Sequence, residues 1–268
     1  MNPGQATGEH EEEWYDLPLY YDIIFDQDTA RETDFLEEVF RLHAGRDFRK
    51  QLDILEPACG SGRLMHRLMD MGHSVVGFDL SLQMVEFSRD RLSQAGHSPK
   101  VFALPMERFS IPGQFDMAFC LVSTFKYLLT EGDARSHLRA VGSHLRSGGI
   151  YVIGLHLSDY PKSQQQRECW SGSRGDVHVD CIIDSDAPDP RSRIEKLQSR
   201  LKIRDHAGIR TINTSWDFRT YDAPQLKTLL ESVPSFTLEG CYDFCYDVNE
   251  PRELDSPWED VILVLKKK

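Results

Sequence analysis

Two acidic residues stand at equivalent points of the sequence, each directly after a short apolar run. Glu56 follows the run 52–55 and precedes Gly60 and Gly62, whereas Asp79 follows the run 74–78. Glycines in a turn let a ligand approach the backbone, and the helix that follows offers free N–H groups. A carboxylate at a neighbouring strand tip is placed to accept two hydrogen bonds from a ribose diol. These residues therefore predict a site for an adenosine-type ligand.

The charge of Glu56 narrows the choice of ligand. The sequence contains no G-x-x-x-x-G-K-[ST] pattern of a phosphate-binding loop, and Met65 stands where a dinucleotide-binding pattern prefers its third glycine. A carboxylate beneath a pyrophosphate would repel it, whereas a carboxylate near an ammonium group attracts it. The sequence therefore favours a ligand that carries positive charge.

A regular alternation of strand and helix patterns surrounds these residues. Strands are expected at 52–55, 74–78, 101–104, 115–122 and 150–157, with helices at 14–25, 30–44, 62–71, 82–95 and 134–145. Ser81 is the expected N-cap of the helix at 82–95. Strands that alternate with helices of this length are typical of an α/β fold with a parallel sheet. The carboxyl ends of such strands share one edge, where open α/β sheets bind their ligands.

The pattern changes after Tyr160. Apolar and polar residues alternate within 177–181, 197–203 and 212–218, which indicates antiparallel strands with one solvated face. We therefore expect a ligand-binding core at 14–160 and an antiparallel insert at 161–221. Residues 222–268 would complete the core sheet. Residues 1–13 are polar and acidic, and we expect them to be a disordered tail.

The composition excludes several classes of protein. The chain of 268 residues has a formal net charge of −12, which argues against a nucleic-acid surface because such a surface needs clustered basic residues. No run approaches the roughly 20 apolar residues of a bilayer span, and the N-terminus has no apolar signal sequence. We therefore expect a cytoplasmic protein without a membrane partner, whose six cysteines are reduced thiols. We predict no metal site, because the cysteine spacing does not favour chelation.

Four segments of the chain resemble a known protein family. Residues 56–64 (EPACGSGRL) resemble the first motif of class I S-adenosylmethionine-dependent methyltransferases, and residues 76–84 (VGFDLSLQM) resemble their second-strand motif. Residues 115–120 and 138–153 resemble their fourth strand, fourth helix and fifth strand. The resemblance implies a Rossmann-like α/β fold, in which helices cover both faces of a mostly parallel seven-stranded sheet. It also implies S-adenosyl-L-methionine (SAM) as the cofactor of the core.

The resemblance implies roles for individual residues. Glu56 would hold the methionine ammonium through water, and Asp79 would bind the ribose. The other cofactor-binding residues implied are Ala58, Gly60 and Gly62 beside the amino-acid part, Leu80 and Met84 against the adenine, Tyr20 or Tyr21 over the methionine end, and Leu121. In the third motif, Pro105 stands where relatives often have an aspartate, so Glu107 or a backbone carbonyl would have to serve the adenine. Met106 and Glu107 are therefore included among the cofactor-binding residues.

The residues after the expected strand 115–122 bear on the substrate. The N/D-P-P-Y/F motif of many nucleic-acid and glutamine amino-methylating enzymes is missing there. By resemblance, the chain is a small-molecule methyltransferase that moves a methyl group to a nitrogen or oxygen nucleophile. His156 is the best candidate for a general base, because imidazole titrates near neutral pH, and Tyr127 is a second catalytic candidate. The insert at 161–221 is similar to those of methyltransferases that act on amino sugars and other small amines, where it roofs the substrate pocket or pairs subunits. Candidates for lining the pocket from the insert are Arg167, Trp170, His178, Trp216 and Arg219.

Other functions are also compatible with the sequence. A protein or RNA methyltransferase would need a basic or extended groove beside the pocket. A SAM-binding protein without methyl transfer would share the cofactor residues, and its affinity for SAM relative to the demethylated product would separate it from an enzyme. A nicotinamide-dependent dehydrogenase is a further alternative, which calorimetry with NAD against SAM would test. The expected partner is a small-molecule methyl acceptor, and the insert is compatible with a homodimer.

Overall fold

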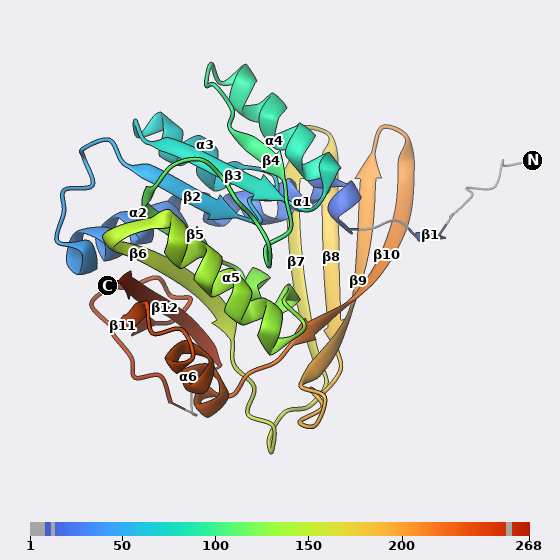
Figure 1. Cartoon of the computed structure of the whole chain (residues 1–268). Coiled ribbons are helices and arrows are strands. Elements are labelled where there is room, and N and C mark those ends of the chain that lie inside the picture. Colours follow the sequence, from blue (N-terminus) through green and yellow to red (C-terminus); the bar gives the residue numbers. More distant parts are fainter. Residues whose placement is uncertain (1–8, 12–13, 256–258) are drawn as a thin grey trace, which may run out of the picture.

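Seven strands form the core sheet, in the order β11-β12-β6-β5-β2-β3-β4 (Figure 1). The computed structural model describes residues 9–11, 14–255 and 259–268. The core strands are β2 (Asp53–Pro57), β3 (Ser74–Asp79), β4 (Val101–Ala103), β5 (Phe115–Cys120), β6 (Leu145–His156), β11 (Phe236–Tyr242) and β12 (Asp260–Lys267). All neighbouring pairs from β6 to β4 are parallel, whereas β12 is antiparallel to both β6 and β11. The strand order reverses between β2 and β5, which is where such sheets bind ligands.

Helices cover both faces of this sheet, as predicted. They are α2 (Thr29–Val39), α3 (Arg63–Asp70) and α4 (Leu82–Gln94) on one face, and α5 (Glu131–His144) and α6 (Ala223–Glu231) on the other. The alternation of β6 explains the two layers, because Tyr151, Ile153 and Leu155 belong to the core under α5 and α6, whereas Ile150 and Val152 belong to the opposite core. A strand that is apolar on both sides can exist only in such a covered sheet.

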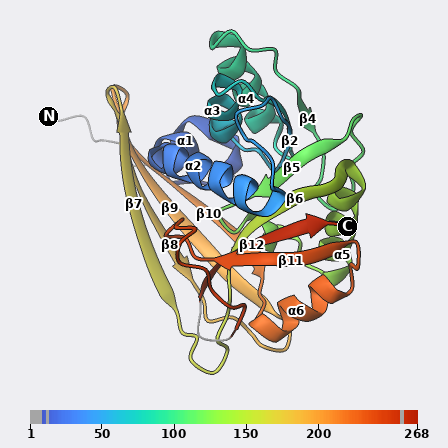
Figure 2. The same cartoon turned by 90° about the vertical axis from the view of Figure 1, so that its left-hand side faces the viewer.

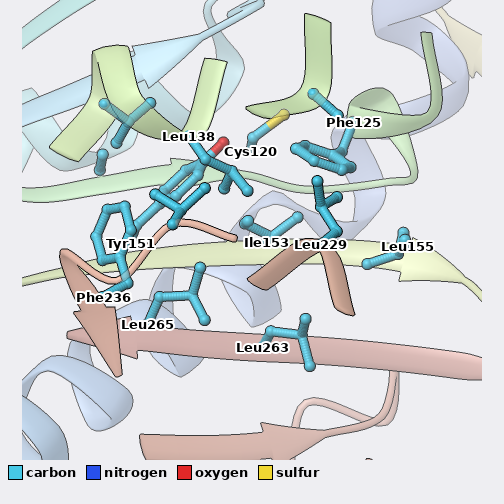
Figure 3. Packing of buried hydrophobic residues seen from close by; sticks show 14 of the residues in the cluster. Cys120, Phe125, Leu138, Tyr151, Ile153, Leu155, Leu229, Phe236, Leu263 and Leu265 are labelled. Carbon is cyan, nitrogen blue, oxygen red and sulfur yellow. The ribbon is translucent and has the colours of Figure 1, made fainter. Parts of the chain in front are cut away.

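The core under α5 and α6 anchors the middle of the sheet. Ile153 of β6 lies among Leu138 of α5, Leu229 of α6 and Leu263 of β12 (Figure 3). Each of these side chains is at most 2% exposed. Full burial of a side chain of this size stabilises a fold by about 1.5–3 kcal/mol. This packing holds the carboxyl ends of β5 and β6 in fixed positions beside the site.

The insert forms a second sheet, in the order β1-β10-β9-β8-β7. Its strands are β1 (Glu9–Glu11), β7 (Gln166–Arg174), β8 (Val177–Ser185), β9 (Ile194–Asp205) and β10 (Gly208–Arg219), of which β7 to β10 pair antiparallel. Helix α1 (Pro18–Phe25) packs on one face of this sheet, where Ile23 and Ile24 join Val179 and Leu201 in a third core. A Cβ at Gly172 of β7 would overlap the Ile23 carbonyl oxygen, so the sheet and the helix touch closely. Helix α1 therefore lies between the insert and the core (Figure 2).

The structure differs from the predicted elements in several places, among them these three. The helix expected at 30–44 ends as an α-helix at Val39 and continues as a π-helix over Phe40–Ala44, which Gly45 terminates at a φ of 63°. Strand β2 extends to Pro57, so Glu56 lies within the strand rather than after it. Residues 9–11 of the expected disordered tail instead form β1 along the edge of β10, whose backbone groups would otherwise lack strand partners. The rest of that expected tail lies outside the described residues.

Two further expectations concern the environment of the protein. All six cysteines are free thiols in the structure. Among residues 9–11, 14–255 and 259–268, no helix has both the length and the apolar character that crossing a membrane requires.

Candidate active site

The loop between β2 and α3 lies at the carboxyl edge of the core sheet. Its residues Ala58, Gly60 and Gly62 all have a left-handed backbone, with φ values of 53°, 53° and 70°. A Cβ at Gly62 would overlap the Ser88 hydroxyl of α4, so glycine alone fits there. Ala58 adopts the same region although a side chain there costs about 1–2 kcal/mol. These are the three residues that the sequence assigns to the amino-acid part of the ligand, and local strain of this kind is often found at ligand sites.

Asp79 ends β3 beside this loop and is almost fully buried. Its Oδ2 accepts a hydrogen bond from the Gly60 N–H at 2.8 Å, and its Oδ1 accepts one from the Ser81 N–H at 2.9 Å. Burial raises the pKa of Asp79, while the backbone hydrogen bonds from Ser81 and Gly60 oppose this rise by favouring the charged form. Each carboxylate oxygen has a second lone pair. Asp79 therefore holds the glycine loop and can still accept hydrogen bonds from a diol.

Glu56 lies in the neighbouring strand and is buried. Its Oε2 has no hydrogen-bond partner in the described part of the chain. Burial raises the pKa of Glu56 well above its ordinary value; Arg63 lowers it, and the carboxylates of Glu32 and Asp79 raise it. A buried oxygen without a partner is costly, and a bound donor or cation would remove that cost. Glu56 is therefore suited to hold a positively charged group.

A small cavity of about 30 Å³ joins Glu56 to the glycine loop. Tyr21, Ala58 and Leu121 are among its lining residues. The ring of Tyr21 lies over the loop, because a Cβ at Gly60 would stand 3.5 Å from the ring carbon Cε1. Burial raises the pKa of the Tyr21 hydroxyl, so it stays protonated and can donate a hydrogen bond. This cavity brings together four of the residues predicted to bind the cofactor.

The sequence left open whether Tyr20 or Tyr21 faces the ligand, and their contacts now distinguish them. The Tyr20 hydroxyl accepts a hydrogen bond from Arg210 of β10, whose guanidinium carbon lies 5.2 Å from the centre of the Tyr20 ring. Adjacent residues of a helix point about 100° apart, so only one of the two can face the loop. Tyr20 ties α1 to the insert, and Tyr21 covers the glycine loop.

Buried charges fix α1 over the same loop. Asp22 is fully buried and accepts a hydrogen bond from the Ser61 hydroxyl at 2.6 Å. It also pairs with Arg91 of α4 and Arg174 of β7. One carboxylate therefore links the glycine loop, a core helix and the insert. The sequence analysis missed Asp22, although a single acid within the apolar helix PLYYDIIF is a pattern that could have found it.

A larger cavity of about 510 Å³ lies between the carboxyl edge of the core sheet and the insert. It shares Tyr21, Val122 and Thr124 with the smaller cavity, so the two adjoin. The chain turns sharply here after β5, because Val122 and Ser123 have left-handed φ values of 56° and 60°. A ligand in the small cavity would therefore present one end to the large cavity.

His156, predicted as a general base, lines the large cavity at the end of β6. Its Nδ1 lies 2.5 Å from Oδ1 of Asp260 at the start of β12. Its backbone N–H donates to the Ser123 hydroxyl at 3.2 Å, which joins the end of β6 to the turn after β5. An imidazole whose Nδ1–H is held by a carboxylate has Nε2 free to accept a proton. The sequence missed Asp260 because 104 residues separate it from His156.

Tyr127, the second catalytic candidate, also lines the large cavity. Its hydroxyl forms a hydrogen bond with the hydroxyl of Tyr15, and its ring packs edge-on against Phe218 of β10 with centroids 4.7 Å apart. Burial raises the pKa of Tyr15, and nearby Tyr127 and Asp79 raise it further. Tyr15 thus lies between Asp79 and the large cavity.

The predicted adenine residues differ in their exposure. Leu80 is 75% exposed, whereas Met84 is fully buried. Met106 is half-buried, and its carbonyl oxygen accepts a hydrogen bond from Nδ1 of His137 at 3.0 Å. The side chain of Glu107 is 30% exposed. Leu80 and Glu107 are therefore the members of this group whose side chains are open to a ligand.

The insert contributes two of the five residues that the sequence suggested for the pocket. Trp170 and Trp216 line the large cavity. The other three are engaged elsewhere: Arg167 pairs with Asp184, His178 pairs with Asp180, and Arg219 donates to the carbonyl of Leu129. Sequence reasoning missed a buried ion pair in the wall, in which Lys126 Nζ lies 2.9 Å from Oε2 of Glu195 on β9. No local pattern could have found it, because Lys126 lies in the 3₁₀ helix after β5 and Glu195 is 69 residues further along the chain.

One histidine and acid cluster lies apart from these cavities. His66, Asp70 and His97 have potential ligand atoms that all lie within 4.8 Å of one another, although no metal site was predicted. His66 lies within α3, Asp70 is the last residue of that helix, and His97 follows α4. Asp70 already lies 2.8 Å from His97 Nε2 and 3.5 Å from His66 Nε2, so ion pairing accounts for the arrangement. We assign it no metal.

The sequence of residues 54–149 matches the family model of a methyltransferase domain. The matched segment is a methyltransferase domain, and it includes the glycine loop and Asp79. It is 26% identical over 172 residues to a glycine/sarcosine N-methyltransferase of Halorhodospira halochloris, which covers 60% of this chain and 62% of the relative. It is also 26% identical over 136 residues to a dTDP-3-amino-3,6-dideoxy-alpha-D-glucopyranose N,N-dimethyltransferase of Streptomyces fradiae, with 50% of each chain covered. The chain spans about half the length of the curated relatives it matches.

The methyltransferase fold extends to the insert. The fold is similar to that of CalS10, an amino pentose methyltransferase from Micromonospora echinaspora whose structure has SAM bound. The TM-score is 0.70 at 15% identity, over 97% of this chain and 99% of that chain. The segment matched by the family model holds the glycine loop and Asp79, whereas α1 and the insert, which close the large cavity, lie outside it. The methyltransferase family match therefore covers the cofactor side of the site better than the acceptor side.

Proposed function

We propose that the protein is a SAM-dependent methyltransferase that acts on a nitrogen or oxygen nucleophile of a small molecule. The observation that carries the proposal is the buried Glu56 Oε2, which lacks a partner among the described residues and lies next to a glycine loop held by Asp79. The match to a methyltransferase domain and the activities of the relatives support it. The six free thiols fit the reducing cytoplasm in which we expect it to work.

The described residues fit SAM. Glu56 would face the ammonium of the methionine part, where a positive group removes the cost of an unpaired buried carboxylate oxygen. Asp79 would accept hydrogen bonds from the ribose hydroxyls. Tyr21 would cover the methionine part, as it already covers the glycine loop. Leu80 would lie against the adenine, since its side chain is open to solvent. When bound, SAM supplies a methyl group on a positively charged sulfur.

The chain's own residues would align the acceptor and take up its proton. Tyr15 and Tyr127 are hydrogen-bonded to each other between the cofactor site and the large cavity. There they would exclude water and orient the acceptor. His156 would accept the proton at Nε2, because Asp260 engages its Nδ1. Asp260 would keep the imidazole in the tautomer and orientation that this step requires.

Calorimetry of the full chain with SAM, its demethylated product and NAD tests the cofactor. We expect both sulfur nucleosides to bind and NAD not to bind. Asp79→Ala should lower SAM affinity at least about tenfold, since a hydrogen bond to a charged group contributes about 1.5–3 kcal/mol. Asp90→Ala, an exposed site on α4, is the matched control. Unchanged affinity in a folded Asp79→Ala variant, or NAD binding in place of SAM, would overturn the proposal.

The role of His156 needs a kinetic test. His156→Gln should lower kcat by about 10²- to 10⁴-fold, with KM changed little, if the imidazole removes a proton in the slow step. Raising the pH should recover part of the rate, because the acceptor then loses its proton to solvent. A variant that keeps its kcat, or one in which only KM changes, would show that His156 is not the base.

A further inference from the structure

The charges on the wall of the 510 Å³ cavity are unequal. Five acidic side chains line it, whereas the basic ones are two lysines and His156. Both lysines are already engaged: Lys126 lies 2.9 Å from Glu195, and Lys162 lies 2.8 Å from Asp159. No arginine is among the described residues that line the cavity. The wall therefore offers no free cation to a ligand.

Two of the five acids have no ion-pair partner within the described part of the chain. These are Glu168 of β7 and Glu259, just before β12. Both are exposed: Glu168 lies on β7, on the insert side of the cavity, and Glu259 lies next to β12, on the core side. Deeper inside, the small adjoining cavity adds the unpartnered Oε2 of Glu56, which is 6% exposed. Because the potential of a cleft sums over its walls, this cavity attracts cations and repels anions.

Aromatic rings make up a further part of the wall. Eight aromatic residues line the cavity: Trp14, Tyr15, Tyr21, Phe25, Tyr127, Trp170, Trp216 and Phe218. A cation over an aromatic ring is attracted by the negative face of the ring. The protein already uses this interaction here, since Lys126 Nζ lies 4.9 Å from the centre of the Phe218 ring. The wall thus combines the two features that bind an organic cation, namely negative charge and aromatic faces.

We propose that the methyl acceptor is a cationic amine with an aromatic or aliphatic body and no phosphate or carboxylate group. This inference rests on the proposed function and goes further by naming the class of acceptor. A phosphate or diphosphate group needs arginine, free lysine or a helix N-terminus to bind it. The acceptor named for the Streptomyces fradiae relative carries such a diphosphate, and the cavity of this chain is unsuited to it.

The acidic wall affects the protonation state in which an amine binds. A bound amine would arrive as an ammonium ion, which has no lone pair and cannot attack. It would first transfer one proton from nitrogen to Nε2 of His156, whose Nδ1 faces Asp260. The neutral nitrogen would then form a bond to the methyl carbon of SAM as the carbon–sulfur bond breaks, and that electron pair would stay on sulfur. The products are the methylated ammonium ion, which now carries the positive charge, and the uncharged thioether, and the proton leaves from His156 to solvent.

The test measures ligand binding to the full chain saturated with S-adenosylhomocysteine. The probes are 2-phenylethylamine and tryptamine as aromatic amines, 2-phenylethanol as the neutral counterpart, and phosphoethanolamine and glycine as amines that carry an anionic group. We expect the aromatic amines to bind at least tenfold more tightly than the other three, with affinity that falls as salt increases. Equal or tighter binding of phosphoethanolamine or 2-phenylethanol would overturn the inference. Failure of S-adenosylhomocysteine to bind would instead overturn the proposed function.

Variants separate the wall charges from general effects on the fold. The double variant Glu168→Gln with Glu259→Gln should weaken tryptamine binding three- to tenfold and leave S-adenosylhomocysteine binding unchanged. Trp170→Leu should weaken the binding of the aromatic amines three- to tenfold as well. Glu86→Gln, at an exposed position of α4 away from the cavity, is the matched control and should bind tryptamine like the native chain. If the double variant also binds like the native chain, the acidic wall does not select the acceptor.

Discussion

The unpartnered oxygen of Glu56 makes Glu56→Gln the sharpest test of the cofactor assignment. Glutamine has nearly the same shape as glutamate and lacks its charge, so β2 and the glycine loop should keep their geometry. In the proposed complex, Glu56 faces the ammonium of the methionine part. A hydrogen bond between charged groups contributes about 1.5–3 kcal/mol, so the variant should bind SAM about 10- to 150-fold more weakly.

A second ligand serves as the internal control for Glu56→Gln. 5′-Methylthioadenosine has the adenosine and the sulfur of SAM but lacks its amino-acid part. Its affinity should change less than twofold, because nothing in it reaches Glu56. Calorimetry of both ligands with both proteins gives four affinities from which the ammonium contribution follows directly. An equal change for the two ligands, or no change for either, would refute the assignment of Glu56 to the ammonium.

The pH dependence of stability and of SAM affinity gives a second test of Glu56. Because burial raises the pKa of Glu56 above its ordinary 4.5, the folded chain holds this proton more tightly than the unfolded chain. The native protein therefore loses stability as the pH rises above 4.5, and Glu56→Gln should have the higher Tm at pH 8 but not at pH 4.5. SAM affinity should rise with pH in the native chain, because the ionised carboxylate binds the ammonium, and stay level in the variant. Thermal unfolding and calorimetry across this range check both.

Three further outcomes follow from the structure. Gly62→Ala should destabilise the fold by about 2–5 kcal/mol in denaturant unfolding, because the new side chain would stand at a position with a left-handed backbone and would overlap Ser88. Gly45→Ala, at a left-handed position with open space around it, should cost about 1–2 kcal/mol, and equal losses for the two variants would contradict the packing argument. Burial lowers the pKa of His137 from 6.5 to about 4, so the unfolded chain binds this proton more readily than the folded chain. The free energy of unfolding should therefore fall by up to about 3 kcal/mol as the pH drops from 6.5 to about 4, and His137→Gln should abolish this fall. Asp260→Asn should slow kcat at least about tenfold by releasing the His156 ring, and an unchanged kcat would remove Asp260 from the mechanism.

Local patterns were enough to predict much of the core. Ser81 accepts the Met84 N–H as the predicted N-cap of α4, and the strand that Asp79 ends was expected from its apolar run. Capping and strand periodicity depend on residues a few positions apart, so a single sequence carries them. The π-helix at Phe40–Ala44 and the strand at Glu9–Glu11 were not predicted, because tertiary contacts rather than local preference decide such segments.

Local sequence patterns were sufficient for the strands, the glycine loop and the two carboxylates at the sheet edge, because each of these depends on residues close together in the chain. Tertiary packing was needed to decide which tyrosine covers the loop, since that depends on the rotation of α1 between the insert and the core. It also decided that Asp260 meets His156 and that Glu195 neutralises Lys126, pairs that lie 104 and 69 residues apart. The acidic and aromatic character of the large cavity likewise depends on the tertiary structure, because its wall is formed by residues of both sheets.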